Sequence, residues 1–299
     1  MRRTLPRRAG IGYELRMGFL DRIAECNNAD FSRLLPFSVG AAQVGWIDPK
    51  FARILQRFPG VFAVGARGVS LAPSLDTPAK RSKAMDRVLR QLTQDKIIKG
   101  WRDETYAVNP LGGGRALLTM ERAGVPHFGV RAQGVHMNGL VRKRDGIHMW
   151  IGRRSKGKET YPGMLDNMVA GGQPVGISFK ENLIKECREE AGIPRRLAAR
   201  AIPVGAISYA YEGKTEGGIK PDIQYCYDLE LPADFTPRNT DGEIAAFVLW
   251  PISRVARIVR DTRQFKFNCN LCIIDFLLRH GLIGPEHPDY AAICRGLRR

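Results

Sequence analysis

The sequence predicts an α/β fold, an α/β/α sandwich with a mixed sheet, preceded by a smaller, mainly helical α+β region. Two observations lead to this prediction. Up to about residue 108 the apolar residues recur at helical spacing, whereas beyond residue 126 they follow the pattern of β-strands. A helical segment also falls between the predicted strands of the second half, as in a sheet covered by helices.

These patterns divide the chain into four expected segments. The glycine cluster in Asn109–Pro126 marks the main boundary, because glycine and proline interrupt regular elements. We expect a basic N-terminal tail (1–17), a helical or α+β domain (18–125), the sandwich domain (126–280) and a C-terminal tail (281–299).

The N-terminal domain is expected to be built mainly from helices. Helical periodicity is visible in residues 18–35, 48–58 and 82–98, and residues 59–64 are predicted to form a short strand. Asp48-Pro49 and Thr77-Pro78 are typical of helix starts or turns.

The sandwich domain begins with a predicted hairpin of residues 134–143 and 147–154, joined at Arg144–Gly146. A short strand then runs into paired glycines and is followed by a helix over Phe179–Ala191. The later elements are predicted as strands at 201–213, 222–232 and 243–252 and an apolar helix at 268–283.

Composition places the protein among ordinary globular chains. Of 299 residues, 44% are hydrophobic and 26% charged, and no apolar run reaches the ~20 residues of a membrane helix. Neither a signal peptide nor a disulfide framework is visible, so we expect a cytoplasmic protein with free thiols. Cys269 and Cys272 are interpreted as thiols of a core helix, since nothing nearby completes a zinc site.

The charge balance predicts anionic partners. A formal net charge of +17 suits nucleic acid, anionic lipid or phosphorylated metabolites and does not choose among them. The basic residues lack the aromatic interleaving of an RNA-recognition sheet.

Against this background, the helix at 179–191 carries an unusual acidic face. At ~100° per residue, Glu189 and Glu190 lie ~60° and ~40° to either side of Glu186, so the three carboxylates share one face. Like charges on one helix face repel, and a divalent cation removes that cost. Carboxylate oxygens suit Mg²⁺ or Mn²⁺. The competing interpretation is a solvated acidic patch near the end of the helix.

The spacing around this helix resembles the Nudix box, in which a glycine, a glutamate and an R-E-hydrophobic-x-E-E-x-G segment recur at fixed separations. Gly171 and the segment Lys185–Ile193 match it. Two positions depart from it: Ile177 stands at the first glutamate and Lys185 at the arginine, and these two residues form a salt bridge in the family. Since Glu181 precedes Lys185 by four residues, we expect a relocated bridge between them.

The resemblance is closer to one branch, the Nudix proteins related to the module of fungal thiamine pyrophosphokinase, which also lacks the first box glutamate. It extends over most of the chain, from about Gly18 to Leu278. It implies metal-dependent hydrolysis of a small anionic diphosphate, thiamine diphosphate or its oxidised analogues, to the monophosphate and phosphate.

The resemblance also implies roles for individual residues. Glu186, Glu189 and Glu190 would bind the metal, with the Gly171 carbonyl as a further ligand. Glu186 is the first candidate for the general base, and Glu243 in a later loop is the second.

Substrate-binding candidates come from the strands and loops near the box. Arg153 and Arg154 are candidates for holding a diphosphate, since arginine makes bidentate contacts. The aromatic side chains Trp150, Tyr161, Tyr209 and Tyr211 are candidates for a wall against a cationic ring. The alternatives for these residues are solubilising charges and core packing.

Two other functions remain open from the sequence. One is a Nudix hydrolase of another diphosphate, such as a nucleoside diphosphate derivative, because the box fixes the reaction and leaves the rest of the substrate open. The other is a non-catalytic Nudix-fold protein that binds RNA, which would lose affinity steeply with salt.

Overall fold

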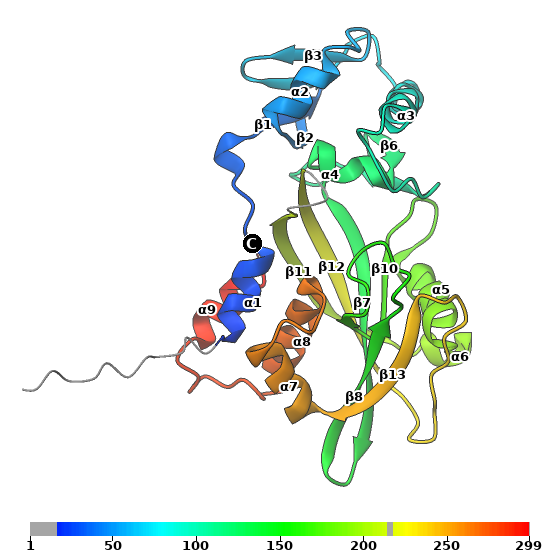
Figure 1. The fold of residues 1–299 in the computed structure, drawn as a ribbon, viewed down its shortest axis with the longest axis vertical. Helices are drawn as coiled ribbons and strands as arrows, with labels where there is room; N and C mark the ends of the chain where they lie inside the picture. The colour runs from blue at the N-terminus through cyan, green and yellow to red at the C-terminus, as the bar shows by residue number, and fades with distance from the viewer. Residues whose placement is uncertain (1–16, 214–217, 299) are drawn as a thin grey trace, which may run out of the picture.

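The computed structural model describes residues 17–213 and 218–298. The expected basic tail lies outside these residues except for Met17. Figure 1 shows an upper sheet with its helices, a larger sheet below it, and helices from both ends of the chain packed together at one side. No helix in the described ranges is long and apolar enough to cross a bilayer.

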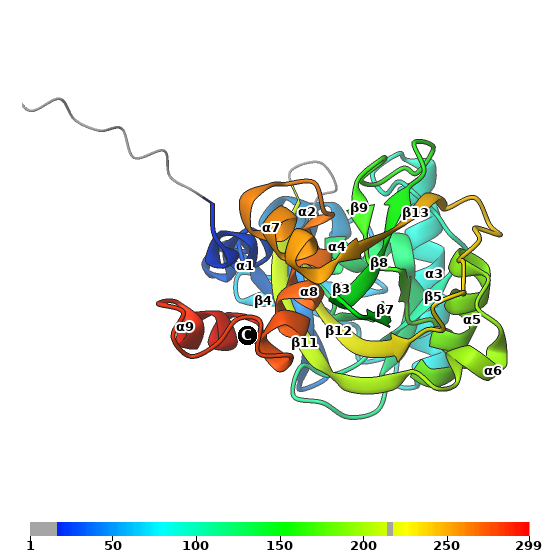
Figure 2. The ribbon, with the colours of Figure 1, turned by 90° about the horizontal axis from the view of Figure 1, so that it is seen from below.

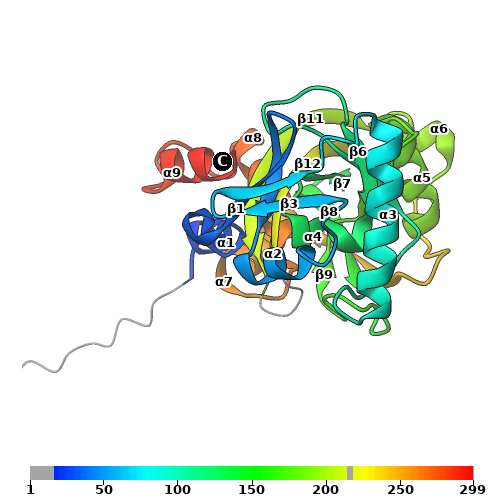
Figure 3. The same ribbon diagram turned by 90° about the horizontal axis from the view of Figure 1, so that it is seen from above.

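The upper part is built around a four-stranded sheet with the strand order β2-β1-β4-β3. Helix α2 packs on this sheet and α3 lies beside it (Figure 3), and both share one core with it through Phe51, Leu55, Met85 and Leu89, all buried. The elements are β1 (Leu35–Val39), β2 (Ala42–Ile47), α2 (Pro49–Leu55), β3 (Phe62–Gly65), β4 (Gly68–Leu71) and α3 (Pro78–Gln94).

Both predicted helix starts in this part are confirmed. The Asp48 side chain accepts a hydrogen bond from the Lys50 amide at 2.7 Å, and the Thr77 side chain accepts one from the Lys80 amide at 3.3 Å. Each cap precedes a proline in the first turn, where a missing amide hydrogen costs nothing.

The first predicted helix is shorter than expected. Helix α1 covers Phe19–Cys26 and is followed by a 3₁₀ turn (Phe31–Arg33) and then by β1. The polar stretch after Cys26 stops the helix, because asparagine and aspartate compete with it by bonding to the backbone locally. Residues 27–35 therefore do not continue the helix.

A hairpin and a short helix connect the two parts. Strands β5 (Thr105–Val108) and β6 (Leu118–Glu121) pair antiparallel, and a 3₁₀ turn (Arg122–Gly124) leads into α4 (Val125–Phe128). The segment that marks the expected boundary thus includes the second strand of a hairpin.

The larger sheet is mixed, as predicted. Its order is β11-β12-β7-β8-β13, with β10 on β7 and β9 on β8, and β12 runs parallel to β7. The strands are β7 (Ala132–Lys143), β8 (Gly146–Arg154), β9 (Leu165–Asp166), β10 (Val169–Gly172), β11 (Ile202–Glu212), β12 (Ile219–Glu230) and β13 (Ile244–Pro251).

Helices cover both faces of this sheet, which confirms the sandwich (Figure 2). On one face, Val135, Met137 and Val141 of β7 pack against α5 (Phe179–Ala191). On the other face, Leu140 and Met149 pack against α7 (Ile252–Asp261) and α8 (Phe267–Arg279). The short helix α6 (Arg195–Ala198) follows α5.

The two ends of the described chain meet on the α8 side of the sheet. Helix α1 packs against α8 and α9 (Tyr290–Gly296), and Phe19, Ile23 and Ile293 are buried in one core with α8. The segment expected to be a C-terminal tail therefore contains a packed helix. The expected boundary between the two domains, after residue 125, stays a prediction.

Candidate active site

Helix α5 presents the acidic residues of the site. Ser178 caps its first turn by accepting a hydrogen bond from the Glu181 amide at 3.2 Å, and Gly192 ends it in the left-handed conformation that favours glycine. Leu183, Cys187 and Ala191 are buried against the sheet. This stripe fixes the direction of the acidic face beside it.

Glu190 is a buried carboxyl group on that face, only 5% exposed. Its Oε2 accepts a hydrogen bond from the Ala170 amide of β10 at 2.8 Å. Burial raises the pKa of Glu190 well above its ordinary value, and the nearby charges of Asp166, Glu186 and Glu243 raise it further. The charged form of Glu190 is therefore disfavoured unless a cation lies beside it.

Glu186 lies directly against β10. A Cβ atom at Gly171 would collide with the Glu186 carboxyl group, so only glycine allows this approach. Burial also raises the pKa of Glu186, while Lys185 lowers it and Glu189 and Glu104 raise it.

Lys185 supplies the positive charge closest to this face. Its Nζ lies 3.2 Å from Glu186 Oε1 and 3.1 Å from Glu189 Oε2. The expected bridge between Glu181 and Lys185 is wrong. Glu181 instead accepts two hydrogen bonds of 2.9 Å from Arg195 of α6, because a guanidinium matches a carboxylate in a bidentate way.

The donors on α5 fit a divalent cation in chemistry and charge. They are hard oxygen ligands, and an ammonium group already stands between two of them. In residues 17–213 and 218–298 no group of three carboxylate, imidazole or thiol side chains is arranged to hold a metal ion. The donors make other contacts in this structure. Glu190 accepts a hydrogen bond from the Ala170 amide, and the Lys185 ammonium pairs with Glu189.

Glu243 approaches the same face from the loop before β13. It forms an ion pair with Lys158, and its side chain is 45% exposed. Since its charge acts on Glu190, it lies near the acidic face, although on a different element.

A cavity of about 210 Å³ adjoins β10 and is lined by basic side chains. Ala170, Gly171 and Gly172 form part of its wall. Its basic residues come from three separate parts of the chain: Arg102, Arg122, Lys220 and Lys266. We call it the cationic cavity.

The N-terminal part contributes directly to this cavity. Tyr106 of β5 is buried against Gly172, in the space that a side chain at that position would need. The Arg122 guanidinium binds Glu104 at 2.6 Å near the same wall. Sequence reasoning missed these residues and the two lysines, because none lies in a charge cluster or motif.

Two of the predicted aromatic residues line the cationic cavity, namely Tyr161 and Tyr209. Tyr209 is buried, and hydrogen bonds fix its hydroxyl group. The hydroxyl donates to Asp222 at 2.9 Å and accepts from Gln224 at 3.1 Å. Tyr161 is half-buried.

The other predicted substrate residues lie away from the cavity wall. Arg154 is buried and binds Asp166 at 2.8 Å and the Thr160 carbonyl at 2.8 Å. Arg153 is exposed and binds the Gly163 carbonyl at 3.1 Å. Trp150 packs on the α5 side of the sheet. Their roles in binding stay predictions.

Asp166, the partner of Arg154, is buried and strongly stabilised as an anion. Burial alone would raise its pKa, but Lys266, Arg154 and the Cys269 thiol lower it to about 2. Cys269 Sγ lies 2.7 Å from Asp166 Oδ1, and Cys272 contacts Gln224 at 3.2 Å. Both thiols are buried in α8, as the sequence predicted.

Comparison with known proteins gives matches over nearly the whole chain. A family model described as "Domain of unknown function (DUF4743)" matches residues 18–132. The chain is 45% identical over 285 residues to "Nudix hydrolase 24, chloroplastic" of Arabidopsis thaliana, covering 94% of this chain and 78% of that protein. It is 44% identical over 293 residues to "Nudix hydrolase 20, chloroplastic" of the same plant, with the same coverage.

Among solved structures, the chain is similar to the NUDIX domain of Shewanella oneidensis NrtR complexed with ADP ribose. The identity is 11% and the TM-score 0.40, over 52% of this chain and 90% of that one.

Proposed function

The chain belongs to the Nudix hydrolase family and is a hydrolase, and we propose that its substrate is thiamine diphosphate or an oxidised analogue of it. Nudix hydrolases generally use divalent metal ions. For this chain we propose Mg²⁺ or Mn²⁺, held by Glu186, Glu189 and Glu190 with the Gly171 carbonyl.

One observation supports the proposal most. Strand β10 separates an acidic face from a basic cavity and touches both. Gly171 packs on Glu186 and Ala170 binds Glu190, while both residues also line the cationic cavity. Hydrolysis of a diphosphate is aided by a metal ion and by fixed positive charges, both of which stabilise the charge on the phosphate oxygens.

The proposed reaction is hydrolysis of the phosphoric anhydride. Water adds to the terminal phosphorus, the bond from that phosphorus to the bridging oxygen breaks, and the monophosphate and phosphate leave. The bound metal would neutralise phosphate oxygens and acidify the attacking water. The proton of the water passes to a carboxylate, for which Glu186 is the first candidate and Glu243 the second.

The basic residues of the cavity would hold and neutralise the phosphates. Burial lowers the pKa of Lys220 to about 8, with Asp222 opposing this shift, so the side chain stays mostly charged at neutral pH. Arg122 and Lys266 add fixed charges beside it. Tyr161 and Tyr209 would give the organic part of the substrate an aromatic surface.

A panel of diphosphates tests the proposal. We expect Mg²⁺- or Mn²⁺-dependent phosphate release with kcat/KM highest for thiamine diphosphate or its oxidised forms, compared with nucleoside diphosphates and ADP-ribose. Equal turnover of the nucleotides would contradict the thiamine assignment, while the assignment as a hydrolase would stand. No turnover of any diphosphate would contradict the reaction as well.

A further inference from the structure

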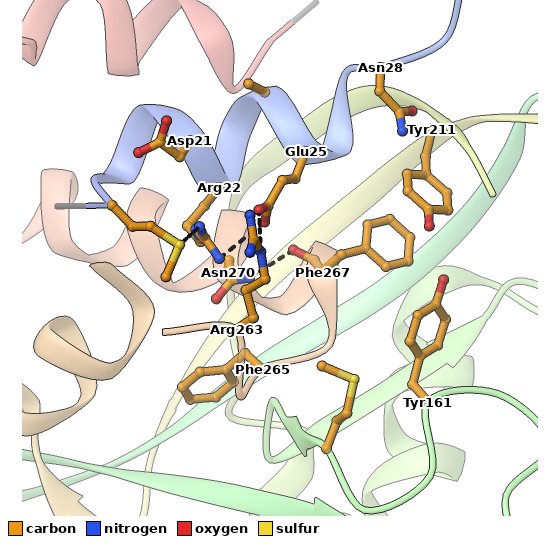
Figure 4. A pocket seen from close by; sticks show the side chains of 13 residues that line it. Asp21, Arg22, Glu25, Asn28, Tyr161, Tyr211, Arg263, Phe265, Phe267 and Asn270 are labelled. Atoms are coloured by element: carbon orange, nitrogen blue, oxygen red, sulfur yellow. Dashed lines mark hydrogen bonds and ion pairs between the residues drawn. The ribbon is translucent and has the colours of Figure 1, made fainter. Parts of the chain in front are cut away.

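A second, larger cavity of about 720 Å³ lies between α1 and the start of α8 (Figure 4). Helix α1 forms one wall with Arg22, Ala24 and Glu25. The opposite side comes from the sandwich, with Tyr161, Tyr211 and Phe267 gathered at one end in Figure 4. We call it the α1 cavity. Its volume is in the range of small-molecule sites.

Aromatic rings join the α1 cavity to the cationic cavity. Tyr161 and Phe267 line both. The Tyr211 and Phe267 rings are stacked with centroids 4.1 Å apart, and the Tyr161 ring lies 5.4 Å from Phe267. A molecule that enters both cavities therefore passes along these rings, and a flat ring bound there would have an aromatic face to stack on.

The charges of the two cavities differ. The α1 cavity has Arg22 and Arg263, but Glu25 binds them at 3.1 and 2.7 Å and thus balances them. Asp21 adds a second acid. The cationic cavity is lined by four basic side chains and one acidic one, Asp222, while Glu104 and Glu159 outside that lining bind Arg122 and Arg102 at 2.6 Å. Only the cationic cavity suits the phosphates, so the α1 cavity suits the part of a substrate without them.

Two buried polar atoms on the wall of the α1 cavity lack hydrogen bonds. Asn270 is 2% exposed and its Oδ1 has no partner among the described residues, while its Nδ2 donates to the Phe267 carbonyl. Arg22 is fully buried and its Nε is likewise without an acceptor. Buried polar groups are normally paired, so a turn of the Asn270 side chain toward the cavity would let its Oδ1 bond to a ligand with a polar edge.

We propose that the α1 cavity is the subsite for the organic part of the diphosphate substrate, a flat nitrogen-containing aromatic ring with hydrogen-bonding groups on its edge. The ring stacks along Tyr211 and Phe267, its edge bonds to Asn270, and its diphosphate extends past Tyr161 into the cationic cavity. Helix α1 thereby takes part in substrate selection. This inference rests on the proposed function, because it assumes a diphosphate at β10.

The first test fills the cavity from an exposed position. Ala24 lies on α1, is exposed and lines the cavity, so Ala24→Trp adds bulk there without disturbing a core. The matched control is Ala79→Trp, at an exposed position of α3 outside both cavities. The readout is the ratio of kcat/KM for thiamine diphosphate to that for a simple alkyl diphosphate.

We expect Ala24→Trp to lower this ratio at least about tenfold, through KM, and Ala79→Trp to leave it unchanged. Tyr211→Leu should lower it in the same direction, and Tyr211→Phe, which keeps the ring, should restore it. An unchanged ratio in both Ala24→Trp and Tyr211→Leu would overturn the subsite. A melting curve on each variant shows that it is folded.

A binding measurement separates this inference from the proposed function. Thiamine without phosphate is added to the wild-type protein, Ala24→Trp and Ala79→Trp, and binding is measured by equilibrium dialysis. Binding that only Ala24→Trp loses supports the subsite, even if no thiamine diphosphate is hydrolysed. Absence of binding to the wild-type protein, or equal binding to all three, would overturn the subsite while hydrolysis of the diphosphates still tests the reaction.

Discussion

Two buried carboxyl groups in this protein, Glu190 and Asp166, have opposite pKa shifts. Asp166 is 3% exposed and is surrounded by Arg154, Lys266 and the Cys269 thiol, which lower its pKa to about 2 against the effect of burial. Glu190 is 5% exposed and has one amide hydrogen bond and three negative neighbours, so its pKa is raised.

The difference shows what a buried carboxylate requires. An anion removed from water is tolerated when cations or several donors replace the water. Asp166 receives its cations from the chain, as a structural ion pair. Glu190 does not, and this is what is expected of a side chain that takes its positive charge from a bound metal ion.

The largest expected effect concerns the buried ion pair of Asp166 and Arg154. Arg154→Met should lower the free energy of unfolding by about 3–5 kcal/mol, because Asp166 would be left buried with one cation fewer. Urea denaturation at pH 7 measures this. The neighbouring Arg153→Met is the control and should stay within about 0.5 kcal/mol, since Arg153 is exposed. Similar losses in both variants would mean that Arg154 is not a buried structural charge.

Glu190→Gln is expected to act on activity instead. It should lower kcat for phosphate release at least about a hundredfold, because the amide can still accept from Ala170 but carries no charge for a metal. Glu230→Gln, at an exposed position of β12, is the control. Retained activity in Glu190→Gln would remove Glu190 from the metal site.

The same variant tests the raised pKa in the metal-free protein. A carboxyl group whose pKa is raised by folding adds stability that is complete below the unfolded value of 4.5 and is lost as the pH rises through the folded value. Wild-type protein treated with a chelator should therefore lose stability as the pH rises above 4.5, whereas Glu190→Gln should lose less. Mn²⁺ should restore the wild-type protein only.

Asp166 should show the reverse dependence. Its folded pKa of about 2 lies below the unfolded value of 3.8, so its contribution is present above pH 3.8 and is lost as the pH falls toward 2. The loss amounts to about 2 kcal/mol. Urea midpoints of wild-type protein and Asp166→Asn between pH 5 and 2.5 measure it. Parallel pH profiles would show that Asp166 is not held as an anion.

The smallest effect is expected at Lys185. Lys185→Met removes the ammonium group between Glu186 and Glu189 and should lower the stability of the metal-free protein by roughly 0.5 kcal/mol, since the lysine is partly exposed. Saturating Mn²⁺ should abolish the difference from wild type. Lys180→Met on the same helix serves as the control, and an equal effect there would deny Lys185 any special role.

Much of the fold was predictable because its signals are local. Helix α5 has the predicted bounds, Phe179–Ala191, since its cap, its apolar stripe and its terminal glycine lie within the helix or next to it. The hairpin of β7 and β8 was predictable from its turn. Strands β1 and β2 were missed although they pair with each other in a local hairpin, because the residues before them follow a helical pattern.

The candidate site combines residues with local signals and residues from distant segments. The three glutamates of α5 are visible in the sequence because they occupy one turn of a helix. Lys220, Lys266 and Arg122 come from segments far apart in the sequence and meet only in the folded chain. The wrong pairing of Glu181 has the same origin, because its partner Arg195 belongs to the next helix.

The packing of α1 on α8 and α9 has a mechanical consequence. The upper sheet is joined to the sandwich at both of its ends, at one end through α1 and at the other through the direct step from α4 into β7. Asn28 reinforces the first joint by accepting from the Glu212 amide at 2.7 Å. A single connection would let the upper sheet rotate freely relative to the sandwich, whereas two connections restrict the rotation to one axis. The β5-β6 hairpin and the turn after it, which bring Tyr106 and Arg122 to the edge of β10, are therefore part of a region held at two places.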